Sequence, residues 1–242
     1  QNAVIGLVDG MTALGLEKDQ IKFALVPYAG FVNVGPEFGP KVSGLGLITK
    51  LGADWLDQDA KAPVPQSDLP SNFSRFAMYK HLGVKWPGCV ETRIPKDKAL
   101  HDVDDTVPDV TDVNSLFTPF FAVDEPDTAW KYPNSYLPDD GVPVKGKNAT
   151  EADREKQLAR YGQTGAYVKP KNVVDALTQT LKWKKPKIDN SPSKFYSNKK
   201  DPKGPGFGCE VEPLVPLTAS ASEITKTVKK LEANGSTNML EG

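Results

Sequence analysis

The sequence has few of the residues that most often carry catalysis or bind metals. It contains only two cysteines and two histidines in 242 residues. Neither His81 nor His101 lies near the other or near a nucleophile motif. No GxSxG, HExxH or P-loop motif occurs, and Gly44-Leu45-Gly46 lacks the third glycine of a dinucleotide-binding loop. These absences exclude motif-based serine hydrolases, zinc proteases and nucleotide-binding enzymes, and we interpret both histidines as surface or packing residues.

An excess of charge of one sign is also missing. Lys and Arg number 30 against 31 Asp and Glu, a net charge of -1, so we expect no nucleic-acid partner and no binding to an anionic membrane. Hydrophobic residues make up 38%, and no run approaches the roughly 18 apolar residues of a spanning helix. Residues 1–15 do not resemble a signal peptide, so an export signal would have to lie outside this chain.

Proline is abundant: the 242 residues include 21 prolines beside 20 glycines. Proline is thus about 9% of the chain, where about 5% is usual. Most of these breakers fall between residues 36 and 206, where few periodic segments occur apart from two expected helices at 150–161 and 171–183. Charge is divided as well: residues 1–150 carry 14 basic and 20 acidic side chains, and residues 151–242 carry 16 and 11. We therefore expect 36–206 to be a loop-rich, Pro-rich insertion.

The two ends of the chain have clear periodicity. Apolar residues at helical spacing predict a helix over 2–15 that packs on something larger, and one long or two short strands should follow over 20–34. A short strand is predicted over 211–218, followed by a helix that Ser220 or Ser222 caps and that stops at Asn234-Gly235. The apolar stripe of the first helix consists of Val4, Leu7, Val8, Met11 and Leu14. The sequence thus predicts an α/β core from residues 1–35 and 207–242.

Three local patterns suggest binding chemistry, and each has a simpler interpretation. Residues 189–193, Asp-Asn-Ser-Pro-Ser, fit a D-x-S-x-S metal loop, but the lysine-rich segment before them favours a solvated loop. The acidic group at 102–112 lacks the spacing of an EF-hand and is interpreted as a solvated acidic loop. The lysine-rich segment 182–203 interleaves aromatic residues, yet no nucleic-acid motif accompanies it.

The two cysteines follow glycines in loop-like contexts, in Trp-Pro-Gly-Cys and Gly-Phe-Gly-Cys. From their spacing alone, two unpaired thiols and a disulfide that closes a long loop are both open. The disulfide would require an oxidising compartment.

Several short phrases occur in a fixed order along the chain. They are Ala-Leu-Val-Pro-Tyr (24–28), Val-Asn-Val-Gly-Pro (32–36), Trp-Pro-Gly-Cys-Val-Glu (86–91), Leu-Phe-Thr-Pro-Phe-Phe-Ala (116–122), Asp-Glu-Pro (124–126), Asn-Ser-Tyr-Leu (134–137), Cys209 with Pro-Leu-Thr (216–218), and Gly-Ser-Thr-Asn (235–238). In this order the chain resembles the TadE/TadG-like proteins of Tad/Flp pilus assembly, which are envelope proteins with a von Willebrand factor A (vWA) domain.

The resemblance implies that this chain is an internal part of such a protein and forms a partial vWA (Rossmann-like) fold. The chain would begin on the helix after the first metal loop and stop just after the second. Thr237 would then be a direct or water-mediated Mg²⁺ ligand in the complete protein, with the other ligands outside this chain, and Ser236 and Asn238 are candidate binding residues. No cofactor is expected in this part alone, since Thr237 offers one neutral oxygen. Export, also implied, favours a Cys89–Cys209 disulfide.

The function that the resemblance implies is binding without catalysis, and no catalytic residue is assigned. The complete protein would be anchored in the envelope by a helix absent here and would work in the periplasm or at the cell surface. It would bind pilus-assembly proteins, pilin or a surface ligand through the vWA surface and the insertion. Aromatic residues of the insertion are candidate anchors, although we expect most of them in its core: Trp55, Trp86, Phe117, Phe120, Phe121, Trp130 and Tyr136.

Two other functions remain open. The first is a periplasmic hydrolase that uses carboxylates of the insertion, which would need two carboxylates facing each other across a cleft. The second is a purely structural spacer with a degenerate metal site.

Overall fold

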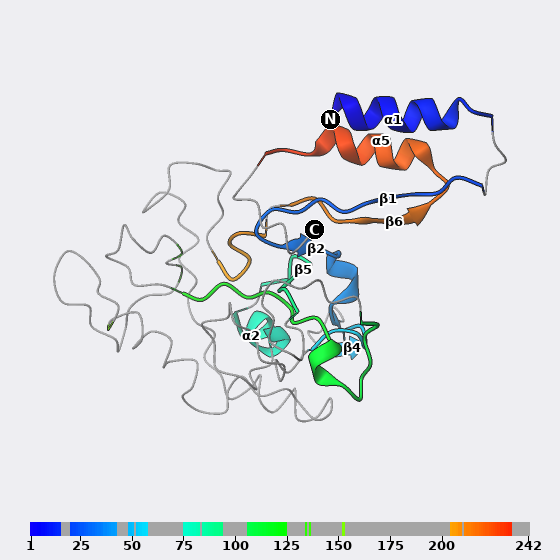
Figure 1. Ribbon diagram of the computed structural model, residues 1–242. Helices are drawn as coiled ribbons and strands as arrows, with labels where there is room; N and C mark the ends of the chain where they lie inside the picture. Colours follow the sequence, from blue (N-terminus) through cyan, green and yellow to red (C-terminus); the bar gives the residue numbers. More distant parts are fainter. Residues whose placement is uncertain are drawn as a thin grey trace.

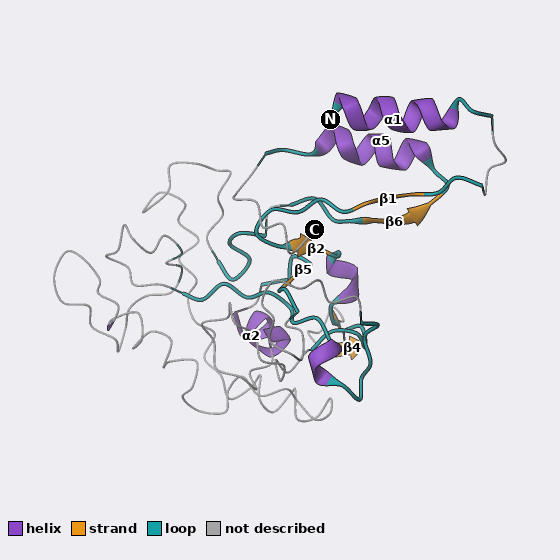
Figure 2. Cartoon of the chain, in the orientation of Figure 1, coloured by secondary structure: helices purple, strands orange, loops and turns teal. Residues whose placement is uncertain are grey.

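The structure, a computed structural model, is described here for residues 1–15, 20–42, 48–50, 52–57, 75–82, 84–93, 106–124, 134, 136, 152, 204–209 and 211–233. Within these residues the chain combines helices with three small antiparallel sheets, each of two strands. It is therefore a mixed α and β structure, as the sequence predicts. Loops make up most of the described chain between the second and sixth strands (Figure 2).

The two ends of the chain fold together into one layered unit, which we call the terminal layer (Figure 1). It consists of helix α1 (Asn2–Thr12), strand β1 (Phe23–Leu25), strand β6 (Val215–Thr218) and helix α5 (Ala221–Lys230). Strand β1 pairs antiparallel with β6, and α1 lies along α5, which contacts both strands. A side-chain bond from Gln1 to the carbonyl of Leu231 also joins the two ends.

Helix α5 begins where the sequence places its cap. The side chain of Ser220 accepts a hydrogen bond from the backbone N–H of Glu223, and Lys229 and Lys230 stand in the last turn, where the helix dipole favours cations. Ile224 and Val228, four residues apart, are buried on the face toward the sheet and α1. The helix ends at Lys230, earlier than the predicted stop at 234–235, which lies outside the described residues.

Helix α1 differs from its prediction in what its apolar stripe contacts. Only Val8 is buried, in a small core with Val215, Ile224 and Val228, and Ile5 packs against this core. The other four side chains of the stripe are exposed: Val4, Leu7, Met11 and Leu14, with Leu7 at 63% and Leu14 at 66%. The prediction that the whole stripe packs on a larger body is therefore wrong for this chain. Helix α1 packs on α5 and the small core beneath it, so only the side of α1 that faces them is covered.

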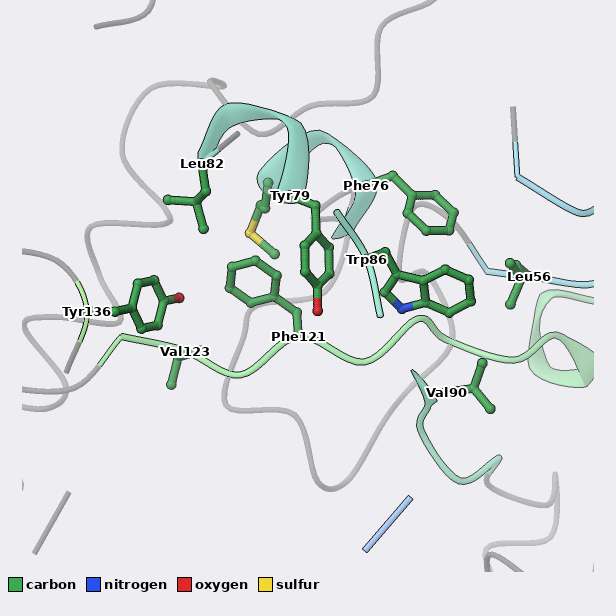
Figure 3. Close-up of a cluster of buried hydrophobic side chains, with 10 residues drawn as sticks. Leu56, Phe76, Tyr79, Leu82, Trp86, Val90, Phe121, Val123 and Tyr136 are labelled. Atoms are coloured by element: carbon green, nitrogen blue, oxygen red, sulfur yellow. The ribbon is translucent and has the colours of Figure 1, made fainter. Parts of the chain in front are cut away.

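The second unit of the structure is built around one aromatic core (Figure 3). Helix α2 (Arg75–Leu82) and strand β5 (Cys89–Val90) contribute to it, and β5 pairs antiparallel with β2 (Val32–Asn33). Strands β3 (Lys41–Val42) and β4 (Ile48–Lys50) form the third pair, and two short 3₁₀ turns occur at η1 (Pro36–Phe38) and η2 (Val113–Ser115). The buried members of the core are Leu56, Phe76, Met78, Tyr79, Leu82, Trp86, Val90, Phe121, Val123 and Tyr136.

The predicted strands are present but short. The expected segment over 20–34 forms the two short strands β1 and β2, and the segment over 211–218 is a strand only in β6. Short strands fit the turns and prolines that interrupt these segments, since proline cannot donate to a strand ladder. Their stability has to come from packing and from contacts at their ends.

The packing of the terminal layer leads to a first prediction. Replacing Ile224 with alanine should lower the free energy of local opening of α5, β1 and β6 by about 2 to 5 kcal/mol. The reason is that truncation of this buried side chain leaves a cavity in the small core. Hydrogen exchange of the amides in these elements measures this change. Leu217→Ala is the matched control: Leu217 is exposed on β6, so its change should stay within about 0.5 kcal/mol. Equal effects of the two variants would contradict the packing described here.

Candidate functional site

The residues expected at the metal site lie outside the described part of the structure. Ser236, Thr237 and Asn238 are all in this category, as are the D-x-S-x-S phrase at 189–193 and the expected helices at 150–161 and 171–183. Thr237 as an Mg²⁺ ligand therefore stays a prediction. Among the residues that the structure describes, no group of three or more His, Cys, Asp or Glu side chains is placed to hold a metal ion.

The two cysteines, in contrast, are joined. A disulfide links Cys89 to Cys209 across 120 residues of sequence, with the Cα atoms 5.8 Å apart, inside the usual range for such a bond. Cys89 lies in β5 and is fully buried, and Cys209 ends the turn at 204–209. The pairing that the family resemblance implies is thus present in the structure. It joins the two ends of the segment between Cys89 and Cys209.

Asn33, opposite the disulfide cysteine Cys89, donates and accepts several hydrogen bonds. Asn33 faces Cys89 in the β2–β5 pair, and its side chain accepts from the N–H of Gly35 at 2.9 Å and donates to the carbonyl of Val211 at 3.0 Å. Its backbone carbonyl accepts from the N–H of Leu214 at 2.8 Å. We call these residues, Asn33, Cys89, Cys209, Val211 and Leu214, the junction, since the chain leaves the terminal layer and returns to it there.

One glycine is required at the junction. Gly88 has a φ of 111°, which side chains rarely adopt, and a Cβ there would lie 2.3 Å from Oδ1 of Asn33. The Trp-Pro-Gly-Cys phrase therefore has a structural reason: its glycine lets the chain turn against Asn33, and its cysteine then enters β5.

The aromatic candidates for partner binding are mostly core residues, as we expected. Trp86, Phe121 and Tyr136 are buried in the aromatic core, and Trp55 and Phe117 pack against its edge. Trp86 donates its indole N–H to the carbonyl of Cys89 at 3.0 Å, which ties the core to the junction. Trp130 lies outside the described residues.

Buried charges accompany this core. Arg75 is only 1% exposed, and the electrostatic field of the carboxylates of Glu91 and Asp57, both buried, acts on it. Burial lowers the pKa of Arg75, and Glu91 and Asp57 oppose that shift. Burial also raises the pKa of Tyr79 well above its ordinary value, and the charge of Glu91 adds to the rise. These acidic side chains are turned into the protein, where their charges favour the cationic form of Arg75.

The acidic loop has a defined shape in its described part. Ser115 accepts the N–H of Asp109 at 2.7 Å through its hydroxyl, which also lies 2.7 Å from the carbonyl of Asp112 and donates to it. Asp109 accepts both the N–H and the hydroxyl of Thr111 at 2.8 Å through Oδ1. Asp112 caps η2 through the N–H of Asn114. The described carboxylates of this loop thus accept hydrogen bonds from the loop itself, in agreement with a solvated loop.

Among the described residues, Asp109 is an exposed acid whose pKa is shifted. The backbone N–H of Thr111, followed by its hydroxyl, lowers the pKa of Asp109, because both donors stabilise the carboxylate form.

None of the helices formed by described residues has the length and apolarity that a membrane span requires.

Comparisons with known proteins give no relatives: no family model matches the chain, and neither a curated protein nor a solved structure is significantly similar to it.

The disulfide leads to a second prediction. A double variant, Cys89→Ser with Cys209→Ser, should lose about 4 to 5 kcal/mol of unfolding free energy, since the bond closes a loop of 120 residues that otherwise has full freedom in the unfolded chain. Denaturant unfolding followed by tryptophan fluorescence measures the loss, and the untreated and reduced wild-type proteins are the controls. Two free thiols, found by non-reducing mass spectrometry in protein from an oxidising compartment, would contradict the bond.

Asp109 gives a third prediction. Its pKa in the folded protein should lie below the unfolded value near 3.9, so its contribution to loop stability is complete above that value and is lost as the pH falls through the folded pKa. Carboxyl chemical shifts followed from pH 7 to 2 measure this pKa. In Thr111→Val the hydroxyl donor is missing and the pKa should move back toward 3.9. An unchanged pKa in that variant would mean that the hydroxyl bond has no effect on the carboxylate.

Proposed function

We propose that this chain is part of a TadE/TadG-like envelope protein and supports pilus assembly by binding, without catalysis. In this proposal, residues 1–35 and 207–242 belong to a vWA-like core, and residues 36–206 are an insertion that binds a pilus component or a surface ligand. The protein works in the periplasm or at the cell surface. The observation that carries the proposal is the terminal layer, in which the two ends of the chain build one α/β unit around a long intervening segment.

The order and direction of elements in this layer support a vWA-like core. A helix precedes β1, β1 pairs antiparallel with β6, and a helix follows β6 on the same face as the first. The exposed apolar residues of α1 support it too, since a helix on a wider sheet would bury them against a neighbouring strand. Two-stranded sheets are marginal alone, so a layer of this kind is expected to gain stability from further strands.

The disulfide supports the assignment to the envelope. Such bonds persist in oxidising compartments and are rare where thiols are kept reduced. Burial of both sulfurs in the junction gives this one a structural function, because β5 and the returning chain meet there.

Binding is favoured over hydrolysis by the burial of the described acids near the core. Asp57, Glu91 and Asp124 are each no more than 3% exposed, and Asp124 accepts the N–H of Tyr136 at 2.7 Å. A glycosidase-type mechanism needs two carboxylates that reach the substrate from opposite sides. Among the described residues, these acids do not face solvent as such a mechanism requires.

The metal part of the proposal leads to a fourth prediction. In the full-length protein, Mg²⁺ at about 100 times its dissociation constant should stabilise the folded state by about 2.7 kcal/mol, visible as a higher melting temperature. Thr237→Ala should abolish most of this shift. Thr225→Ala, which changes a threonine of α5 eleven positions or more before residues 236–238 in the sequence, is the matched control and should keep it.

The outcomes separate the parts of the proposal. A full-length protein that Mg²⁺ does not stabilise would overturn the metal-dependent surface and favour the spacer with a degenerate site. A shift that survives Thr237→Ala would place the ion elsewhere and remove the residue assignment.

A further inference from the structure

The two hydrophobic cores of the structure are built from different parts of the chain. Every described residue of the aromatic core falls between residues 34 and 136. The small core of the terminal layer combines residues 5–25 with residues 215–228, so it forms only when two distant segments meet. Leu25 and Val215, which pair in β1 and β6, lie 190 positions apart in the sequence. Because the entropy cost of closing a loop grows with its length, this cost falls mainly on the terminal layer.

The disulfide shortens the loop that β1 and β6 have to close. Leu25 lies eight positions before Asn33, which faces Cys89 in the β2–β5 pair. On the other side of the bond, Cys209 lies six positions before Val215. The probability that the ends of a loop meet falls as the 3/2 power of its length. Shortening the loop from 190 to roughly 14 residues therefore makes contact of β1 with β6 roughly 50-fold more probable.

Hydrogen bonds from the second unit place Cys209 beside Cys89. The backbone N–H of Ala122 and the hydroxyl of Tyr79 both donate to the carbonyl of Pro205 at 2.8 Å, in the turn that ends at Cys209. Each of these bonds replaces a bond to water in the open chain, so its net contribution to stability is modest. The hydrogen bonds thus position the turn for oxidation, and the covalent bond then prevents the turn from leaving.

We propose that formation of the Cys89–Cys209 bond switches the terminal layer from open to closed, whereas the aromatic core folds with or without the bond. The two thiols lose two protons and two electrons in thiol–disulfide exchange with an oxidant of the disulfide class, R–S–S–R, which leaves as two R–SH. The terminal layer is then open where thiols are kept reduced and closes in an oxidising compartment.

The switch acts during folding. Cys89 has no exposed surface in the closed structure, so a reductant reaches the bond only after local opening. Closure by oxidation requires neither a metal ion nor a binding partner. It therefore does not depend on the proposed function, and either can fail without the other.

The experiment measures hydrogen exchange of the whole chain in two states: oxidised, and refolded from denaturant in the presence of a dithiol, with thiol counts to confirm each state. The reference amides are those of Asp57 and Phe117, which donate to the carbonyls of Phe117 and Trp55 at 2.7 and 3.0 Å. Reduction should make the amides of β1, β6 and α5 exchange at least about tenfold faster, which corresponds to about 1.4 kcal/mol. The reference amides should change less than about threefold. Oxidised glutathione, added to the reduced chain, should restore slow exchange in the terminal layer.

A second test is Cys209→Ala, which removes the bond and leaves the sulfur of Cys89 in β5. In the presence of the dithiol this variant should exchange like the reduced wild type. Leu217→Ala, which truncates an exposed side chain of β6 and keeps the bond, is the matched control and should exchange like the oxidised wild type.

Two outcomes would overturn the proposal. If reduction leaves exchange in the terminal layer unchanged, the non-covalent contacts suffice to close it. If reduction accelerates the terminal layer and the reference amides by the same factor, the bond supports the whole fold and does not switch the terminal layer alone.

Discussion

The disulfide between Cys89 and Cys209 is the contact on which the rest of the structure depends. Residue 209 precedes β6 by six residues, and Asn33, which faces Cys89, follows β1 by eight. Once Cys209 is fixed beside Cys89, the strands β1 and β6 have only short segments left to close before they pair. Without it, the same pairing has to close a loop of nearly 200 residues, and the entropy cost of closure rises with loop length. The disulfide therefore lowers the entropy cost of pairing the short strands β1 and β6.

Polar side chains replace regular secondary structure in the second unit. Tyr79, for example, donates to the carbonyls of Phe120 and Pro205, and Asn134 donates to the carbonyl of Val123 and accepts from the N–H of Gly204. These bonds satisfy backbone groups that a strand or helix would otherwise pair, and a buried backbone group without a partner is costly. Three of these bonds join segments that lie 41, 70 and 126 residues apart in the sequence, so the core and the chain that returns to the junction hold each other in place.

This distribution of contacts explains how much of the fold could be predicted. Helix α5 was predictable because its cap Ser220 and its buried Ile224 and Val228 are local signals. The bond from Asn33 to Val211 spans 178 residues, and no periodic pattern announces it. Sequence also could not indicate that α1 buries only Val8 of its stripe, because periodicity reports an apolar face and not what covers it. For the candidate site, the described part of the acidic loop, residues 106–112, is largely exposed as expected, and Asp102, Asp104 and Asp105 lie outside the described residues. Arg93 donates to the carbonyls of Thr106, within this loop, and Ser115, just after it, and no local signal predicts these tertiary contacts.

The acidic loop and the junction are connected through β5, and this connection restricts how far the loop can move. The segment that follows the loop lies along β5: Glu91 N–H donates to the carbonyl of Thr118, and Phe120 N–H donates to the carbonyl of Cys89. The residue that carries the disulfide thus also holds the base of the loop. Ala122 N–H then donates to the carbonyl of Pro205, in the turn that ends at Cys209. A loop supported in this way keeps its exposed face in one orientation, because its base cannot shift without breaking contacts on both sides of the disulfide.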